Sequence, residues 1–365
     1  MASGELLTID LLCIDYLEYA KHYYRSPSGT VTSEYGSLRS AFRPLVEEFG
    51  TTLASDFGPL ALKRVRERMI EKGHCRTSIN DMVHRIRRMF AWAVENELVD
   101  VTVHEALRRV ACLRVGRTEA RESERILPVS VATVNATLPH LPQVVADMVR
   151  LQLATGARPG EICQLRPQDV DRSTEPWLYR PAHHKTAHRG KERRIYIGPE
   201  GQAILSPYLD RKPHEFCFSP AESIQAKRDA AHLRRRLPLT HGNRPGTNRK
   251  VAPRWKPTRE YDRTAYTRAI ARGCEKAFGM PRELRVIPGK LPESQKAELR
   301  KKAAEWRAAH VWSPNQLRHT RATMLREKFG IEAAQTVLGH SELSVTEMYA
   351  ERNFAKAAEI MREVG

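Results

Sequence analysis

The side chains best suited to chemistry lie in four short segments in the second half of the chain, at residues 154–162, 184–186, 313–323 and 338–350. Guanidinium groups stay charged and donate hydrogen bonds in a planar fork, which suits a phosphate anion. Histidine and lysine can transfer protons, and a tyrosine hydroxyl can act as a nucleophile. The groups of interest are Arg158, Glu161, Lys185, Arg318, His340 and Tyr349.

These residue types match the requirements for breaking a phosphodiester bond without a metal ion. The reaction needs a nucleophile, positive charge at the nonbridging oxygens, and a proton for the departing oxygen. Phosphodiester cleavage is therefore the chemistry that these segments suggest.

The order and spacing of the segments resemble the motifs of the tyrosine recombinase (phage integrase) family. A-T-G-A-R-P-G-E-I at residues 154–162 looks like the family's first arginine box, and H-K-T at residues 184–186 looks like its hairpin lysine. S-P-N-Q-L-R-H-T-R-A-T at 313–323, L-G-H at 338–340 and T-E-M-Y-A at 346–350 look like the remaining boxes. The resemblance is specific over residues 126–220 and 306–352, and looser over the N-terminal half.

The resemblance implies a role for the tyrosine and for both arginines. Tyr349 would attack DNA and form a 3′-phosphotyrosyl intermediate, which keeps the bond energy and allows rejoining without ATP. Arg158 and Arg318 would grip the scissile phosphate. The activity implied is that of a site-specific DNA recombinase.

The resemblance also implies roles for three supporting groups and needs neither a metal nor a cofactor. Lys185 would protonate the leaving 5′ oxygen, although Arg189 and Lys191 stand in the same turn. His340 would hydrogen-bond the phosphate. Glu161 would orient neighbouring groups, with a plain helix salt bridge as the alternative.

One position departs from the family pattern. The family usually has histidine three residues before its second arginine, and this chain has Asn315 there. An amide can donate a hydrogen bond to phosphate, but it takes up no proton near neutral pH. Either the remaining groups suffice, or His319 compensates, or the protein binds DNA and cuts poorly. We expect activity, because the other positions hold the residue types that the chemistry requires.

The first 114 residues are expected to form a helical domain that binds the DNA core site. Apolar residues spaced by three and four predict helices over residues 6–23, 33–49, 57–72 and 77–98. Arg85 and Arg88 lie off the apolar stripe of the last helix, where they contact DNA phosphates or face solvent. Residues 115–125 are charged and lack periodicity, which indicates a linker.

Residues 126–365 are expected to form the catalytic domain. A helix through residues 145–153 stops at Thr155-Gly156, and a short helix follows over about 158–165. Residues 177–179 and 194–198 predict a β-hairpin that carries Lys185 near its tip. The expected fold class is mainly α with a small antiparallel β-sheet.

A basic insert at about 221–300 is longer than the family's minimal core. Residues 227–259 contain eleven Lys or Arg and a single acidic residue, and four prolines disfavour a continuous helix there. We expect an exposed basic loop that grips DNA flanking the core site, with a solvated linker as the alternative. The DNA contacts expected from this region are Arg234, Arg235, Arg236 and Lys250.

The composition agrees with a nucleic-acid partner. The 365 residues include 61 Lys and Arg against 43 Asp and Glu, a net charge of +18, which favours polyanions. No stretch approaches the roughly 18 apolar residues of a membrane span, and the six scattered cysteines suggest neither a disulfide framework nor a zinc site. We therefore expect a cytoplasmic, nucleoid-associated protein.

The function predicted from the sequence is that of a site-specific recombinase, or integrase, of a mobile element. It would act on double-stranded DNA between its two domains and, by resemblance, assemble as a tetramer, with residues 351–364 docking on a neighbouring subunit. One alternative is a sequence-specific DNA-binding protein with weak or no catalysis because of Asn315. Another is a metal-dependent nuclease using His183, His184 and His188, but no acidic cluster accompanies these histidines.

Overall fold

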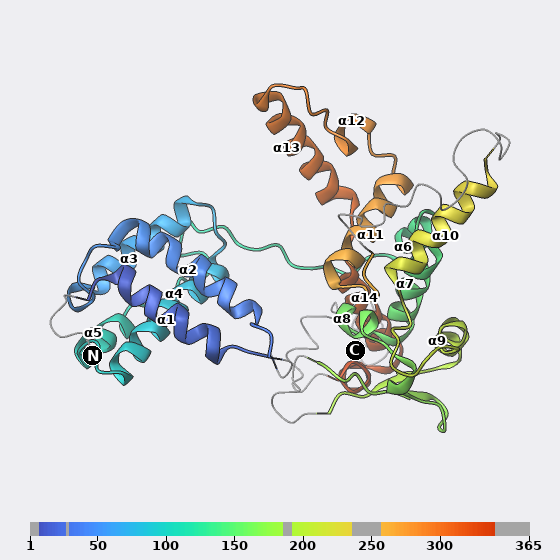
Figure 1. The fold of residues 1–365 in the computed structure, drawn as a ribbon, viewed down its shortest axis with the longest axis horizontal. Helices are drawn as coiled ribbons and strands as arrows, with labels where there is room; N and C mark the ends of the chain where they lie inside the picture. The colour runs from blue at the N-terminus through green and yellow to red at the C-terminus, as the bar shows by residue number, and fades with distance from the viewer. Residues whose placement is uncertain (1–6, 27–28, 185–191, 236–256, 340–365) are drawn as a thin grey trace, which may run out of the picture. The chain divides into compact units, whose positions relative to one another are not determined.

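The computed structural model describes residues 7–26, 29–184, 192–235 and 257–339. The chain divides into two compact units, Met1–Arg125 and Ile126–Gly365, drawn in Figure 1. Each unit has its own cluster of buried apolar side chains. The units are therefore described one at a time.

The described residues of the first unit form five α-helices around one apolar core. They are α1 (Ile9–Tyr23), α2 (Ser33–Phe49), α3 (Pro59–Glu71), α4 (Arg76–Glu95) and α5 (Val101–Arg108). Helix α4 buries one face because its apolar residues recur every three or four positions, and α1, α2, α3 and α5 pack around it. Phe90 of α4 stacks on Phe57, with ring centroids 5.4 Å apart. The four helices predicted for this half from the sequence are present, with slightly shifted ends.

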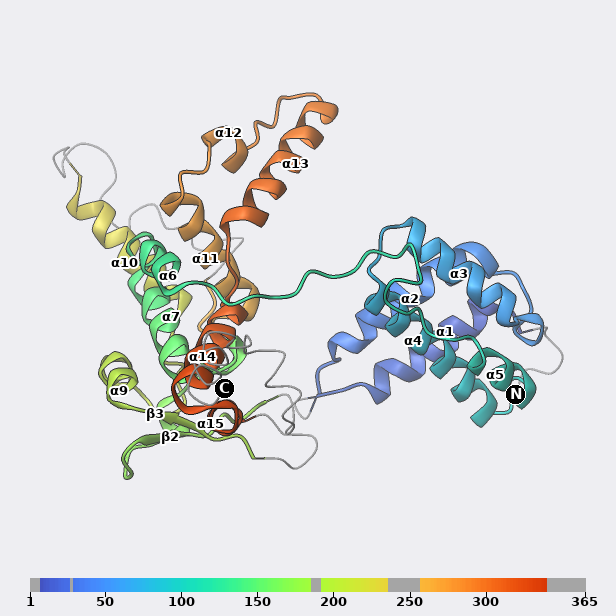
Figure 2. The same ribbon diagram turned by 180° about the vertical axis from the view of Figure 1, so that it is seen from behind.

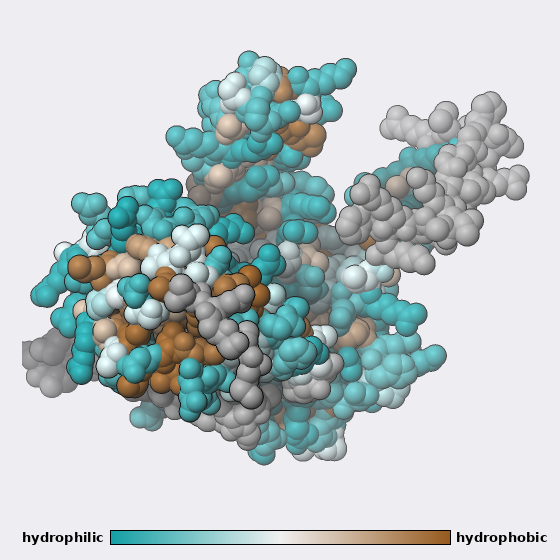
Figure 3. Space-filling view, turned by 60° about the vertical axis from the view of Figure 1, so that its left-hand side comes forward, coloured by the Kyte–Doolittle hydropathy of each residue, from teal (hydrophilic) through white to brown (hydrophobic). Residues whose placement is uncertain are grey.

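Large apolar side chains also reach the surface of the first unit. Leu60 on α3 is 80% exposed and Ile14 on α1 is 61% exposed. Figure 3 shows hydrophobic residues grouped on the face of this unit turned to the viewer. The surface of this unit therefore carries exposed apolar side chains as well as charged ones.

The last residues of the first unit pair with the start of α4. Arg121 forms a β-bridge with Cys75, and the Arg121 carbonyl accepts a hydrogen bond of 2.8 Å from the Arg76 backbone N–H. The Arg76 guanidinium also pairs with Glu122. The later part of the expected linker, residues 115–125, is thus anchored in this unit.

The described part of the second unit places helices around a three-stranded antiparallel sheet. The helices are α6 (Val131–Thr137), α7 (Gln143–Thr155), α8 (Pro159–Cys163), α9 (Pro199–Leu205), α10 (Pro220–Leu233), α11 (Arg263–Ala277), α12 (Arg282–Arg285), α13 (Glu293–His310), α14 (Pro314–Phe329) and α15 (Ile331–Leu338). The strands are β1 (Val170–Asp171), β2 (Trp177–Tyr179) and β3 (Ile195–Ile197), in that order, with Tyr179 opposite both Val170 and Ile195. The expected fold class is confirmed.

Helix α7 occupies the centre of the second unit. Because it is apolar on most sides, it can pack against α9, α14 and β3 at once. Figure 2 shows α14 beside α7, and α15 next to the strands. The two arginine motifs stand at the end of α7 and on α14, so this packing brings together segments that are far apart in the chain.

The region expected as a basic insert, residues 221–300, differs from the prediction. Helix α10 continues to Leu233, so the stretch from Lys227 is helical where an irregular loop was expected. Helix α11 belongs to the core, because Tyr266 and Ile270 are fully buried. Helices α12 and α13 extend away from the sheet (Figure 1). Residues 236–256 lie outside the described residues.

Candidate active site

A groove of about 910 Å³ in the second unit is lined by residues from three of the sequence motifs, those at 154–162, 184–186 and 313–323. Its walls come from α8 and the residue before it, from the segment after β2, and from the first turns of α11 and α14. The residues that matter most for chemistry in it are Arg158, Glu161, His183, His184, Arg263 and Asn315. The fold therefore brings residues 154–162 and 313–323 to one surface.

The turn after α7 places Arg158 at this groove. Gly156 ends the helix in the left-handed conformation, with φ +68°, and a Cβ there would lie 2.6 Å from Leu338 Cδ2. Glycine therefore meets both the backbone and the space requirement of the turn. The chain is extended at Arg158 and Pro159 opens α8. The Arg158 side chain remains 28% exposed, so part of it is open to a ligand.

The Glu161 side chain, which is only 3% exposed, binds both the backbone and the side chain of Arg158. Its Oε2 accepts a 2.7 Å hydrogen bond from the Arg158 backbone N–H, and its Oε1 accepts one of 2.9 Å from Arg158 Nη1. Burial raises the pKa of the carboxyl, but the charges of Arg193 and Arg158 outweigh burial and keep the pKa below its ordinary value. The buried carboxylate is therefore ionised at neutral pH.

Arg193, two residues before β3, is a second partner of Glu161 that the sequence analysis missed. Its side chain is 4% exposed, and its Nε donates to Glu161 Oε1 at 3.2 Å. It also packs on Gly339, which has φ +64° and where a Cβ would collide with Arg193 Nη1. Arg193 thus connects the Glu161 carboxylate to the end of α15.

Gln152 on α7 is a second residue that the sequence analysis missed. It is fully buried. Its Nε2 donates to the carbonyls of Ala157, at 3.2 Å, and of Pro314, at 2.9 Å, while its Oε1 accepts a 3.0 Å bond from the Tyr266 hydroxyl. Ala157 and Pro314 directly precede Arg158 and Asn315. One buried amide therefore joins the backbone of both motifs.

The second expected phosphate ligand, Arg318, is fully buried on α14. Its Nη1 donates to the Gly156 carbonyl at 2.6 Å and its Nη2 donates to the Leu338 carbonyl at 2.8 Å. It does not line the groove, although its charge contributes to lowering the pKa of Glu161, after burial, which acts the other way, and the stronger effects of Arg193 and Arg158. In this conformation Arg318 clamps the turn on which Arg158 stands.

The sequence analysis named His319 as the residue that could compensate for Asn315, but a different histidine lines the groove. His319 is 6% exposed and does not line the groove, whereas His184 does. Burial lowers the pKa of the His184 imidazole; Glu161 acts against this, and Arg158 and Arg193 add to the lowering. His184 is therefore neutral near pH 7 and lies in the field of the charged cluster.

Lys185, His340, Tyr349, Arg236 and Lys250 lie outside the described residues. Arg234 and Arg235 directly follow α10.

The first unit's candidate DNA contacts are engaged inside the protein. Arg85 donates two hydrogen bonds of 3.0 Å to the Glu34 carboxylate, and Arg88 pairs with the same carboxylate while lying over the Tyr24 ring. Burial raises the pKa of Glu34, but both arginines outweigh it and lower the pKa. Both arginines therefore share one carboxylate partner and remain partly exposed, and their expected contact with DNA phosphates stays a prediction.

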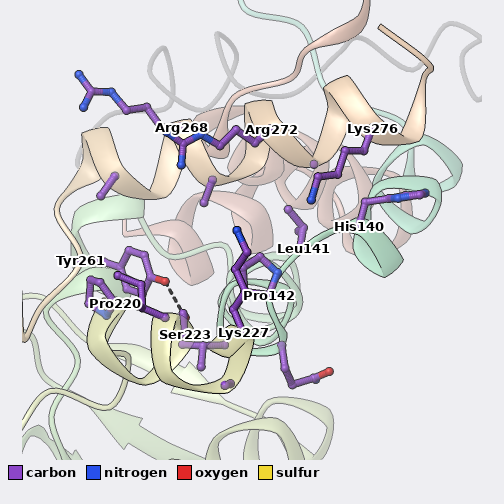
Figure 4. A pocket seen from close by; sticks show the side chains of 17 residues that line it. His140, Leu141, Pro142, Pro220, Ser223, Lys227, Tyr261, Arg268, Arg272 and Lys276 are labelled. Atoms are coloured by element: carbon purple, nitrogen blue, oxygen red, sulfur yellow. Dashed lines mark hydrogen bonds between the residues drawn. The ribbon is translucent and has the colours of Figure 1, made fainter. Parts of the chain in front are cut away.

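A second pocket, of about 670 Å³, lies between α10, α11 and the loop before α7 (Figure 4). Leu141 and Pro142 form part of an apolar wall, and Tyr261 donates or accepts a 2.8 Å hydrogen bond with Ser223. Arg268 and Arg272 project from α11 above it. Arg268 lines both this pocket and the groove, so α11 forms a wall of each.

No three His, Cys, Asp or Glu side chains among the described residues are grouped so that they could hold a metal ion. No helix in the described ranges is both long and apolar enough to cross a membrane.

Solved structures of tyrosine recombinases share this fold, although the sequence matches no family model and no curated protein. The Tn1549 transposon integrase in complex with circular intermediate DNA matches with a TM-score of 0.57 and 16% identity, over 97% of this chain and 99% of the other. A lambda integrase tetramer bound to a Holliday junction matches with a TM-score of 0.60 and 13% identity, over 96% of this chain and 79% of the other. The fold expected from the resemblance is therefore confirmed.

Proposed function

We propose that this protein is a site-specific DNA recombinase, or integrase, that cleaves and rejoins DNA strands through a 3′-phosphotyrosyl intermediate. The observation that carries the proposal is the groove in which Arg158, Glu161 and Asn315 meet, within a fold shared with integrases over nearly the whole chain. The sequence motifs and the fold support the same function.

The groove is built to receive an anion. Arg158 offers a partly exposed guanidinium whose orientation is set by the buried Glu161 carboxylate. Arg263 also lines the groove and adds positive charge. A guanidinium that is already oriented loses little entropy when it binds a phosphate, and it stabilises the charge that develops in the transition state.

Arg318 would join this site by exchanging partners. Its two terminal nitrogens are bonded to the carbonyls of Gly156 and Leu338. A scissile phosphate is a stronger acceptor than a neutral carbonyl, because both partners are then charged. DNA binding would therefore be coupled to a local rearrangement at the end of α7 or α15.

The remaining roles follow the resemblance. Tyr349 would attack the phosphorus, Lys185 would protonate the departing 5′ oxygen, and His340 would hydrogen-bond the phosphate. No cofactor is required, because the phosphotyrosyl bond keeps the energy needed for rejoining.

The proposed partner is double-stranded DNA, bound by a core-binding domain at residues 1–114 and a catalytic domain at 126–365. Matching integrases were solved with DNA, one as a tetramer on a Holliday junction. We extend both features to this chain: a tetramer in the active complex, and work on the nucleoid in the cytoplasm. The net charge of +18 supports a polyanionic partner.

Covalent trapping tests the proposal. Wild-type protein, Tyr349→Phe and Tyr196→Phe are incubated with a nicked random-sequence duplex library, denatured in detergent, and the attached DNA is sequenced. Tyr196 is a matched control because it is 51% exposed on β3 and has no assigned role. We expect attachment by wild type and Tyr196→Phe only. If no variant attaches while all shift DNA on a native gel, the protein is a DNA-binding protein without catalysis.

A further inference from the structure

The pocket between α10 and α11 combines cationic and apolar lining (Figure 4). Arg268, Arg272 and Lys276 are exposed and stand four residues apart on α11, so they form a cationic row with steps of about 6 Å along the helix. Apolar side chains, among them Leu141 before α7 and Ile224 of α10, line the same pocket. An occupant would therefore meet both positive charge and apolar surface.

The charge of the cationic row is not balanced by acids at the pocket. No Asp or Glu is among the described residues that line it, and Lys227 of α10 adds a fourth cation. Glu275, the residue before Lys276, pairs with Arg307 instead, at 2.8 Å. The pocket therefore favours an anionic occupant.

Helix α10 gains little from packing within its own unit. Of its 14 residues only Ser223 is buried, and the Ser223 hydroxyl shares a 2.8 Å hydrogen bond with the Tyr261 hydroxyl. A helix of this length is marginal in water unless it buries an apolar face. Ile224 lines the pocket and is still 37% exposed. An occupant that covered Ile224 would stabilise α10, and it would leave neither hydroxyl without a hydrogen bond.

Duplex DNA and a second copy of this chain fit the pocket less well than an acidic helix does. The phosphates of DNA could meet the cationic row, but the sugar–phosphate backbone would leave the apolar lining in contact with water. A second copy carries a net charge of +18, which opposes a cationic surface. An amphipathic helix with acidic residues every four positions repeats the spacing of the cationic row, and its apolar face can enter the pocket.

We propose that this pocket docks an acidic amphipathic helix of another protein. The carboxylates of that helix pair with the cationic row, and its apolar side chains cover Leu141 and Ile224. The volume of about 670 Å³ lies within the usual range of ligand pockets, roughly 300–1,000 Å³. The partner is additional to the DNA of the recombinase reaction, and its docking does not depend on strand cleavage.

The test measures the affinity of the full chain for fluorescein-labelled helical peptides of about 20 residues by anisotropy. The first peptide carries leucines on one face and glutamates at every fourth position beside them, the second has Gln for each Glu, and the third has Ser for each Leu. The first should bind at least about tenfold more tightly than the others. Arg272→Glu combined with Lys276→Glu should weaken its binding about tenfold, and so should Ile224→Gln. Arg268 is kept, because it also lines the candidate active-site groove.

Matched control variants make the same kind of change away from the pocket. Arg282→Glu combined with Arg285→Glu reverses two exposed charges on α12. Leu233→Gln removes an apolar side chain that is 85% exposed at the end of α10. Because salt screens distant charges, neither control should change the affinity for the first peptide more than about twofold at physiological salt.

Four results would overturn the proposal. Equal weakening by the α11 and α12 charge reversals, or equal binding of the first and third peptides, would show that charge alone attracts the peptide. If Ile224→Gln keeps full affinity for the peptide while the α11 reversal weakens binding of a short DNA duplex, the cationic row is a DNA contact. A peptide of residues 351–364 that binds more tightly than the first peptide would make a second copy the occupant. Covalent trapping is measured separately, so the proposed recombinase function survives any of these results.

Discussion

The Glu161 carboxylate serves two arginines while almost hidden from solvent. Replacing it by Gln removes the charge that compensates Arg193, which is equally buried. Breaking a buried pair in this way costs about 3–5 kcal/mol, so Glu161→Gln should lower the free energy of unfolding by about 3 kcal/mol in urea titrations. Glu192→Gln is the control, because Glu192 and its partner Arg194 are about half exposed, and it should leave the free energy of unfolding almost unchanged.

The pH dependence of this difference follows from the lowered pKa of Glu161. Burial raises that pKa, yet Arg193 and Arg158 bring it below the ordinary value. The carboxylate therefore stabilises the fold fully above its unfolded pKa of about 4.3, and the contribution is lost as pH falls through the lower folded value. The gap between wild type and Glu161→Gln should stay constant from pH 7 to 5 and shrink below about pH 4. A gap that shrinks near pH 6 would contradict this assignment.

For single residues, the sequence predicts those bonding partners that lie close together in the chain. The spacing of Arg158 and Glu161 places them on one helical face, and the structure bonds them. Gln152 and Arg193 were missed although each leaves a signal. Gln152 interrupts the apolar stripe of α7, and Arg193 continues the inward alternation of Ile195 and Ile197. Their partners come from distant segments, which no local pattern reveals.

The junction of α7, α14 and α15 depends on Gly156, the glycine that ends α7. An alanine at Gly156 would adopt φ +68° and meet Leu338 at 2.6 Å, whereas Gly279, with φ +67°, has nothing within 4 Å of its Cβ position. The left-handed conformation costs about 1 kcal/mol and overpacking about 1–3 kcal/mol. Gly156→Ala should therefore lose about 3 kcal/mol in urea unfolding and Gly279→Ala about 1 kcal/mol. Equal losses of unfolding free energy for the two variants would show that Leu338 on α15 moves aside without measurable cost.

Elements with strong periodicity were predicted well, and those defined by tertiary contacts were not. Helix α4 repeats apolar residues over five turns, so its extent could be predicted within a few residues. Helix α10 has one buried residue, Ser223, and is followed by prolines, so its sequence suggested a loop. Helix α11 was assigned to an insert, because only packing with α6, α7 and α8 reveals that it belongs to the core.

For the whole molecule, the excess of positive charge should govern affinity for DNA. Each phosphate that the protein neutralises releases counterions and adds about −0.9 to the slope of log affinity against log salt concentration. Contact with about six phosphates predicts a slope of about −5, measured by fluorescence anisotropy between 50 and 300 mM salt. Residues 126–365 alone should give a shallower slope, provided that both units touch DNA. A slope for the full chain shallower than about −3 would argue against a protein wrapped on duplex.

The β-bridge between Cys75 and Arg121 places a thiol where the chain leaves the first unit. Hydrogen bonds from Ser78 and Thr77 lower the pKa of that thiol to about 7, while burial raises the pKa of Cys13 and Cys163 to about 12. Once Cys112 is replaced by serine, a maleimide dye at neutral pH should react with Cys75 before the buried cysteines. The protein thus carries a native attachment point for a fluorophore at its interdomain boundary, from which DNA engagement can be followed in real time.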